Sequence, residues 1–321
     1  MCYSAQVQAD LRRLVREYGA VLSYQRFAEL LGGMRGGSGW QRIPKAMRSS
    51  LAGLAGESVA ELAQLVEAGE ALQANVYEAE LFQQKTRLAG AERILAEKPT
   101  KKAENDRRVA TDKIERAQRN LADLRRTELL PRDARIFPGS YAPVIVEKDG
   151  KRIAVPMRYQ CRLPGWTPEM ERKMPGTYNA RRDNLEKAWR KLFGYRHGIL
   201  VVDAFYENVA LHTMEHRELA PGEHEENVVL EFRPETKQPM LVACLWSFTK
   251  GGQGEQDLLS FAAITDEPPA EVAAAGHDRC IVPVKEQNLS AWLNPDPADI
   301  SSQYAILDDR QRPFYEHRKA A

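Results

Sequence analysis

Cys2 directly follows the initiator methionine, so removal of Met1 would expose two nucleophiles on one residue. A free α-amine titrates near about 8 and a thiol near about 8.5, so both have an unprotonated fraction at neutral pH. An aldehyde can form an imine with such an amine and then be captured by the sulfur as a thiazolidine ring. A thioester or an amide could instead be attacked by the thiol, with the amine acting as its base.

Three clusters next to apolar segments supply groups that could assist this chemistry. Asn179 precedes a helical pattern, Glu207 ends an apolar strand, and His277 leads into another strand. Arg181 and Arg279 lie two residues after Asn179 and His277, respectively. Each position also has a purely structural explanation, such as a helix cap, an exposed strand end or a buried histidine. Together they offer an amide, a carboxylic acid, an imidazole and two guanidinium groups.

A metal site is the weaker interpretation of the histidines. His212 and His216 are four residues apart and His224 follows, but the spacing is not His-Glu-x-x-His. The charged surroundings and Pro221-Gly222 indicate an exposed loop. The four cysteines have neither paired spacing nor a zinc-like arrangement with histidine. We therefore predict no metal and no other cofactor.

Composition limits the class of protein. The chain has 321 residues, of which 43% are hydrophobic and 28% are charged, and these proportions are ordinary for a soluble globular protein. Its net charge of +1 excludes a global basic field, so DNA binding would need a local patch. No apolar run approaches the roughly 18 residues of a membrane span, and no signal sequence precedes Cys2. We expect a cytoplasmic protein with reduced cysteines and no membrane partner.

The N-terminal half of the chain has helical periodicity. Residues 4–31 carry apolar side chains at helical spacing, and the glycine run at 32–39 reads as a flexible connector because it lacks the Gly-Lys-Ser/Thr ending of a phosphate loop. Residues 57–129 have apolar positions three, four or seven apart, with Pro99 between two runs. This pattern predicts a long antiparallel helical hairpin, although Gly69 falls within its first run. Such an arm is typical of protein interaction or self-association.

The chain after Pro131 is rich in short β-type runs separated by turn residues. These runs lie near residues 144–146, 153–155, 199–202, 228–232, 240–246, 261–265 and 281–284. A glycine run at 251–254 reads as a hairpin tip, and helical pieces are expected at 185–193 and 289–293. Strands without regular alternation with helices predict an α+β fold with a mixed, largely antiparallel core. The segment from Pro295 is polar and is expected to be loosely held.

The order of the motifs resembles the SRAP family, the SOS response-associated peptidase-like proteins that shield abasic sites in single-stranded DNA. The resemblance rests on Met1-Cys2, then Asn179-Ala180-Arg181, Tyr206-Glu207 and His277-Asp278-Arg279. The segments 163–166 and 239–246 are also similar to elements of that family. The resemblance covers residues 1–4 and 136–293.

The resemblance implies a pseudo-barrel fold interrupted by the helical hairpin. The expected parts are residues 1–31 and 131–294 for the family domain, 32–130 for the hairpin insertion, and 295–321 for a C-terminal tail. Three departures affect DNA contacts. Tyr3-Ser4 replaces the family's Gly-Arg, Gln160 replaces a tryptophan, and Asn208 replaces the tryptophan expected after Glu207.

The resemblance also implies residue roles and a partner. Met1 would be removed, by self-processing or by an aminopeptidase, and Cys2 would form a thiazolidine crosslink with an abasic site in single-stranded DNA. Glu207 would exchange protons with the amine, His277 would help to open the sugar, and Asn179 would orient Cys2. A nucleoid-associated location is expected when DNA is bound.

The DNA contacts that the resemblance implies come from three side chains. Arg181 and Arg279 would hold the flanking phosphates with planar, bidentate contacts. Trp166 would stack on a neighbouring base.

Two other classes of function remain open at the level of sequence. An N-terminal-nucleophile amidohydrolase, such as a glutamine amidotransferase half, also begins with cysteine, but it would leave the His277-Asp278-Arg279 cluster without a role. A non-catalytic interaction protein would use the hairpin at 57–129, and Cys2 would then be incidental.

Overall fold

The computed structural model describes residues 3–37, 39–54, 56–252 and 256–320, with backbone only for 57–59. The chain divides into two compact units. The sheet unit comprises residues 1–27, 41–50 and 131–321, and the hairpin unit comprises 28–40 and 51–130. The candidate residues 179, 207 and 277 all belong to the sheet unit, so the site depends on this unit.

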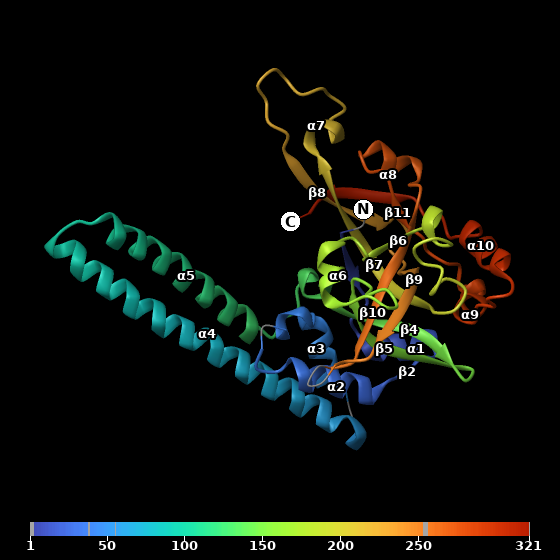
Figure 1. Ribbon diagram of the computed structural model, residues 1–321, viewed down its shortest axis with the longest axis horizontal. Helices are drawn as coiled ribbons and strands as arrows, with labels where there is room; N and C mark the ends of the chain where they lie inside the picture. The colour runs from blue at the N-terminus through green and yellow to red at the C-terminus, as the bar shows by residue number, and fades with distance from the viewer. Residues whose placement is uncertain (1–2, 38, 55, 253–255, 321) are drawn as a thin grey trace. The chain divides into compact units, whose positions relative to one another are not determined.

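The hairpin unit is dominated by two long antiparallel helices, as predicted (Figure 1). Helix α4 spans Glu57–Glu97 and α5 spans Lys101–Arg125. Thr100 caps α5, because its side chain accepts a hydrogen bond from the backbone N–H of Ala103 at 3.2 Å. The buried face of α5 consists of alanines seven residues apart, at positions 103, 110 and 117. These small side chains allow close packing of the two helices.

Gly69 does not interrupt α4, contrary to the doubt that it raises in the sequence. A Cβ atom at this position would lie 2.1 Å from Cη2 of Trp40, a residue of the same unit that is fully buried. Glycine is therefore required here by the close approach of the indole ring, and its cost to helix stability is offset by that packing.

The sheet unit contains one mixed sheet that is largely antiparallel. Within the described residues it has twelve strands. They are β1 Ser4–Val7, β2 Val21–Leu22, β3 Arg135–Ile136, β4 Tyr141–Lys148, β5 Lys151–Tyr159, β6 Asn179–Arg181, β7 His197–Ala210, β8 Asn227–Pro234, β9 Met240–Thr249, β10 Leu258–Asp266, β11 Cys280–Ile281 and β12 Tyr315–Lys319. The predicted α+β class is confirmed.

Five of the strands close on themselves. Strand β7 pairs with β9, β9 with β10, β10 with β5, β5 with β4, and β4 again with β7. Only the β10–β5 contact in this ring is parallel. The second half of β7 extends beyond the ring, where it pairs with β1 and β8. The ring therefore fixes one end of β7, and the outer strands fix the end that carries Glu207.

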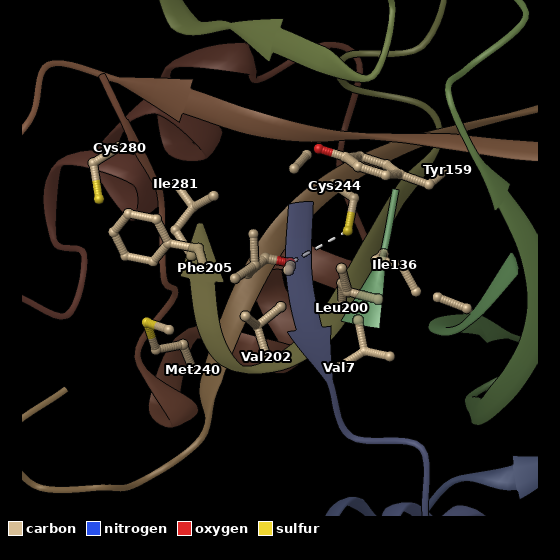
Figure 2. Packing of buried hydrophobic residues seen from close by; sticks show 14 of the residues in the cluster. Val7, Ile136, Tyr159, Leu200, Val202, Phe205, Met240, Cys244, Cys280 and Ile281 are labelled. Carbon is tan, nitrogen blue, oxygen red and sulfur yellow. Dashed lines mark hydrogen bonds between the residues drawn. The ribbon is translucent and has the colours of Figure 1, made fainter. Parts of the chain in front are cut away.

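The core consists of apolar side chains that alternate along the strands. Figure 2 shows part of this cluster, in which Leu200 and Val202 of β7 lie near Val7 of β1 and Ile136 of β3. All four are no more than 2% exposed. Burial of such side chains is the main favourable term in folding, so β1 is held by packing as well as by backbone pairing.

The remaining helices are short. They are α1 Leu11–Tyr18, α2 Tyr24–Met34, α3 Lys45–Ala52, α6 Pro168–Lys173, α7 Leu211–Met214, α8 Ala270–Ala274, α9 Leu289–Leu293 and α10 Ile300–Asp308, with 3-10 turns at Trp40–Arg42, Pro131–Ala134, Arg182–Asn184 and Glu286–Asn288. Across the part of the chain that the structure describes, no helix is both long and apolar enough to cross a membrane.

The structure corrects several local expectations. The segment Ser4–Val7 is a strand and not part of a helix, because long-range pairing with β3 and β7 overrides its local pattern. Gly32 and Gly33 lie inside α2 and not in a connector. Residues 185–193 form successive turns and no α-helix.

The C-terminal segment also differs from expectation. The polar segment after Pro295 contains α10 and β12, and β12 pairs with β8 from Tyr315 to Lys319. The glycine run at 251–254 connects the antiparallel strands β9 and β10, but residues 253–254 lie outside the described part of the chain.

Candidate functional site

The site is centred on a contact between Glu207 and His277. Oε2 of Glu207 lies 3.1 Å from Nε2 of His277, and both side chains are buried. Glu207 comes from the outer half of β7, where Leu230 of β8 is its pairing partner. His277 follows Gly276, whose φ of +94° favours glycine and whose missing Cβ would lie 2.9 Å from Cγ2 of Thr213. The tight turn after α8 therefore carries the imidazole to the carboxylate.

Both ring nitrogens of His277 face hydrogen-bond acceptors. Nδ1 lies 2.8 Å from the carbonyl oxygen of Arg279, a closer contact than the 3.4 Å to the N–H of the same residue. Nε2 faces the carboxylate of Glu207. A neutral imidazole has only one N–H, so both ring nitrogens can donate only when each carries a proton. The contact with Glu207 is short enough for a proton to pass between the carboxylate and the imidazole.

Asn179 is held near the sheet by β6. This strand runs parallel to β10, with Asn179 beside Ala263. The amide is buried, and the hydroxyl of Tyr159 donates to its Oδ1 at 3.5 Å. This contact uses the amide oxygen as an acceptor. Asn179 is therefore not the helix cap that its sequence context allows.

The N-terminal strand enters the sheet beside Glu207. Ser4 of β1 pairs with Tyr206 of β7, the residue immediately before the carboxylate. Met1 and Cys2 lie outside the described residues. Cys2 is separated from Ser4 by one residue in the sequence.

The two arginines that the motifs suggest both have carboxylate neighbours. Arg181 is exposed and forms a bidentate contact with Asp183, at 2.9 Å from Nε and 2.7 Å from Nη2. Nη2 of Arg279 lies 3.4 Å from Oδ2 of Asp278. A phosphate would have to compete with these carboxylates for the guanidinium groups.

Trp166 is not joined to the Glu207–His277 pair by any ring contact or side-chain hydrogen bond among the described residues. Its backbone N–H donates to the carbonyl of Leu163 at 2.9 Å, in a turn before α6 that also includes Gly165 at a φ of +90°. The turn leaves the indole partly exposed.

Arg135 of β3 was missed by the sequence reasoning. Its Nε and Nη2 atoms donate to Oγ of Ser4 at 3.0 and 2.8 Å. Its Cζ lies 3.7 Å from the ring centroid of Tyr206 and 4.9 Å from that of Phe137. Burial lowers the pKa of this guanidinium from its usual value. The one sequence signal was the serine at position 4, where the family that the motifs resemble has an arginine.

Aromatic rings extend from this arginine towards the hydrophobic core. Tyr3 packs edge-on against Phe137, with centroids 5.8 Å apart, and against Tyr178 at 6.3 Å. Tyr178 continues to Tyr159 at 5.8 Å. Tyr3 and Phe137 are 50% and 40% exposed, so their contact area remains accessible to a ligand.

The buried cysteines are unsuited to act as nucleophiles. Burial raises the pKa of Cys161 to about 12 and raises the pKa values of Cys244 and Cys280 strongly as well. At Cys280 the negative charge of Glu207 acts in the same direction. Thiolate chemistry at neutral pH is thus disfavoured at all three positions.

No metal-binding cluster is found among the described residues, where no group of three or more His, Cys, Asp or Glu side chains is suitably placed. His212, His216 and His224 lie on and after α7, and His212 contacts Thr213 through Nε2 at 3.4 Å.

A family model described as SOS response associated peptidase (SRAP) matches residues 103–318. The matched range includes Asn179, Glu207 and His277, begins within α5 and excludes Cys2. No curated protein matches the chain.

Several solved structures resemble parts of the chain. A protein from Bordetella bronchiseptica is 18% identical, with 61% of this chain and 90% of that chain covered and a TM-score of 0.46. A protein from Bacteroides thetaiotaomicron is 14% identical, with 58% and 77% covered and a TM-score of 0.44. A phage-related protein from Bordetella bronchiseptica is 18% identical, with 58% and 80% covered and a TM-score of 0.43.

Proposed function

Because the chain belongs to the SOS response associated peptidase (SRAP) family, we propose that it captures abasic sites in single-stranded DNA through Cys2. The product is a covalent thiazolidine between the protein and the deoxyribose. Removal of Met1, by the protein itself or by an aminopeptidase, precedes this reaction because the α-amine must be free.

The observation that carries the proposal is the buried Glu207–His277 pair beside the entry of the N-terminal strand. The carboxylate and imidazole are 3.1 Å apart, and Ser4 pairs with the residue next to Glu207. Cys2 is two residues before Ser4 in the sequence, so the proposed nucleophile belongs to the chain that leads into that strand end. General acid–base groups act over hydrogen-bond distances, so this proximity is a requirement of the mechanism.

The proposed reaction consumes one aldehyde and releases one water. The sugar opens from its hemiacetal to the aldehyde, with His277 moving the proton. The Cys2 nitrogen attacks C1′, and its proton passes to the new alkoxide to give the carbinolamine. The Glu207–His277 pair donates a proton to the leaving hydroxyl, which departs as water, and takes a proton back from the nitrogen, so that a neutral imine forms. The thiol sulfur then forms a bond to the imine carbon while its proton passes to the nitrogen. No oxidant or reductant is needed.

The surrounding side chains are assigned positioning roles in this proposal. The buried amide of Asn179 orients Cys2 by hydrogen bonding. Arg181 and Arg279 contact phosphates after exchanging their contacts with Asp183 and Asp278. Trp166 stacks on a base near the lesion.

The experiment is to incubate the mature chain with single-stranded DNA that contains one abasic site, followed by denaturing electrophoresis and intact-mass analysis. We expect an adduct whose mass is the sum of protein and DNA minus one water. Cys2→Ala should abolish it, whereas Cys161→Ala, at a buried thiol, should retain it. An adduct that persists in Cys2→Ala would exclude the proposed chemistry.

Two controls separate the alternative functions. Glutamine hydrolysis in the absence of DNA would identify an amidohydrolase instead. Retained Met1 in protein purified from its native source, together with no adduct, would identify a non-catalytic protein. The hairpin at 57–129 is proposed as an interaction or self-association arm, which its deletion would test through a change in oligomeric state.

A further inference from the structure

We propose that Arg135, Ser4, Tyr3 and Phe137 form a nucleotide subsite, which binds one phosphodiester and the unpaired base attached to it. The subsite depends on the proposed function in one respect, namely that the ligand is single-stranded DNA. It is assembled from strands β1 and β3 and the residues that flank them.

The charge of Arg135 is the first argument. Its guanidinium is partly buried and has no carboxylate within ion-pair distance among the described residues. The nearby carboxylate of Glu231 is already engaged by Arg233 at 3.3 Å, by Arg318 at 3.1 Å and by the hydroxyl of Tyr206 at 3.2 Å. A partly desolvated cation without a counterion is costly, and an anionic ligand would compensate it.

The geometry of the guanidinium is the second argument. The two hydrogen bonds to Ser4 Oγ fix one edge of the group, and the Tyr206 ring lies against its plane. The donors on Nη1 remain available, in a fixed direction, for phosphate oxygens. Arginine binds phosphate through such planar, preorganised contacts.

The accessible aromatic pair is the third argument. Tyr3 and Phe137 meet edge-on, and Phe137 also lies beside Arg135. Exposed rings next to a cation are the usual platform for an unpaired base in sequence-tolerant binding of single strands. Since Tyr3 directly follows Cys2 in the chain, the stacked base would belong to a nucleotide near the lesion.

The subsite predicts a specific change in salt dependence. We would measure binding of the full-length Cys2→Ala chain to single-stranded DNA carrying tetrahydrofuran, an abasic analogue that lacks an aldehyde. Adding Arg135→Gln should weaken binding about tenfold, the effect of one charge-assisted hydrogen-bonded contact. It should also reduce the slope of log affinity against log salt by about 0.7, the value for one phosphate on a single strand. Arg12→Gln, at an exposed arginine of α1, is the matched control and should change neither quantity comparably.

Two further variants separate charge from stacking and from structure. Arg135→Lys should preserve the salt slope, and Phe137→Leu should weaken binding about fivefold or more with an unchanged slope, because base stacking contributes roughly 1–3 kcal/mol. Melting temperatures identify any variant that fails to fold. If Arg135→Lys loses the slope as Arg135→Gln does, the residue has a structural role and the subsite is rejected.

The remaining outcomes also decide the question. Equal binding by Arg135→Gln and Arg12→Gln overturns the subsite, as does an absence of DNA binding at low salt. Because the probe contains no aldehyde, failure of wild-type crosslinking would reject the thiazolidine mechanism without affecting this measurement. A normal crosslink with no effect of Arg135 would reject the subsite alone.

Discussion

A buried histidine lies at each end of β7, and the two histidines have different hydrogen-bond partners. At the inner end, His197 accepts from the N–H of Gly194 at 2.8 Å through Nε2, and its Nδ1 lies 3.1 Å from the carbonyl oxygen of Trp292. At the outer end, Glu207 meets His277, whose two ring nitrogens face a carboxylate and a carbonyl. The His197 ring has a donor and an acceptor as partners, whereas the two nitrogens of His277 each face an acceptor.

This difference separates a structural histidine from a candidate for chemistry. His197 is satisfied as a neutral ring, stacks on Trp292 with centroids 4.0 Å apart, and has a pKa that burial lowers to about 3. His197 is therefore neutral near pH 7. His277 instead lies within hydrogen-bond distance of the carboxylate of Glu207, which is the geometry that general acid–base groups require.

The largest expected effect comes from breaking the outer pair with Glu207→Gln. The amide preserves shape but cannot accept or return the proton, so the rate of crosslinking should fall about a hundredfold, at the lower end of general acid–base contributions. The measurement is the single-turnover rate of adduct formation with saturating abasic DNA.

The control for this variant is its affinity for DNA carrying the tetrahydrofuran analogue. That affinity should match wild type, because Glu207 is fully buried and the proposed DNA contacts come from other side chains. A wild-type rate would show that the carboxylate has no part in the chemistry and would remove the contrast between the two ends.

The inner end should respond through stability and not through rate. Because the native pKa of His197 is below the value of about 6.5 expected for the unfolded chain, the unfolded state binds the proton first. This contribution is fully present above about pH 6.5 and is lost as pH falls towards 3. By pH 5 the loss amounts to about 2 kcal/mol.

His197→Gln should therefore flatten the decline in unfolding free energy between pH 7 and pH 5 by about 2 kcal/mol. Urea denaturation at both pH values measures this difference, and the crosslinking rate at pH 7 serves as the control. An unaltered decline would mean that His197 is protonated in the native state, and a lost crosslink would connect the inner end to the chemistry.

The sequence predicts those parts of the molecule that local pattern controls. Periodicity predicts α4 and α5, and apolar runs predict the central strands. Glu207 and His277 stand at the ends of such runs, so their proximity could be proposed. The strand at Ser4–Val7 could not, since it has only four residues and its partners are more than a hundred positions away.

The same limit applies to the arginines. Arg181 was singled out because it lies in a motif, although Asp183 stands only two residues away. Arg135 has no distinguishing neighbour in sequence. Its importance depends on what lies around it in space, namely Ser4 and Tyr206, and on carboxylates that bind elsewhere. A lack of counterions is a three-dimensional property and leaves no trace in spacing.

The smallest expected effect concerns Tyr206, which precedes Glu207 and faces the opposite side of β7 because side chains alternate along a strand. Burial raises the pKa of Tyr206 to about 12, so its hydroxyl stays a neutral donor to Glu231 at any working pH. Tyr206→Phe should lower the unfolding free energy by about 1 kcal/mol, the net value of one hydrogen bond, and leave the crosslinking rate within about twofold. A loss of rate as large as that of Glu207→Gln would mean that side chains on both faces of β7 take part in the reaction. The effect of the outer end would then not come from the carboxylate of Glu207 alone.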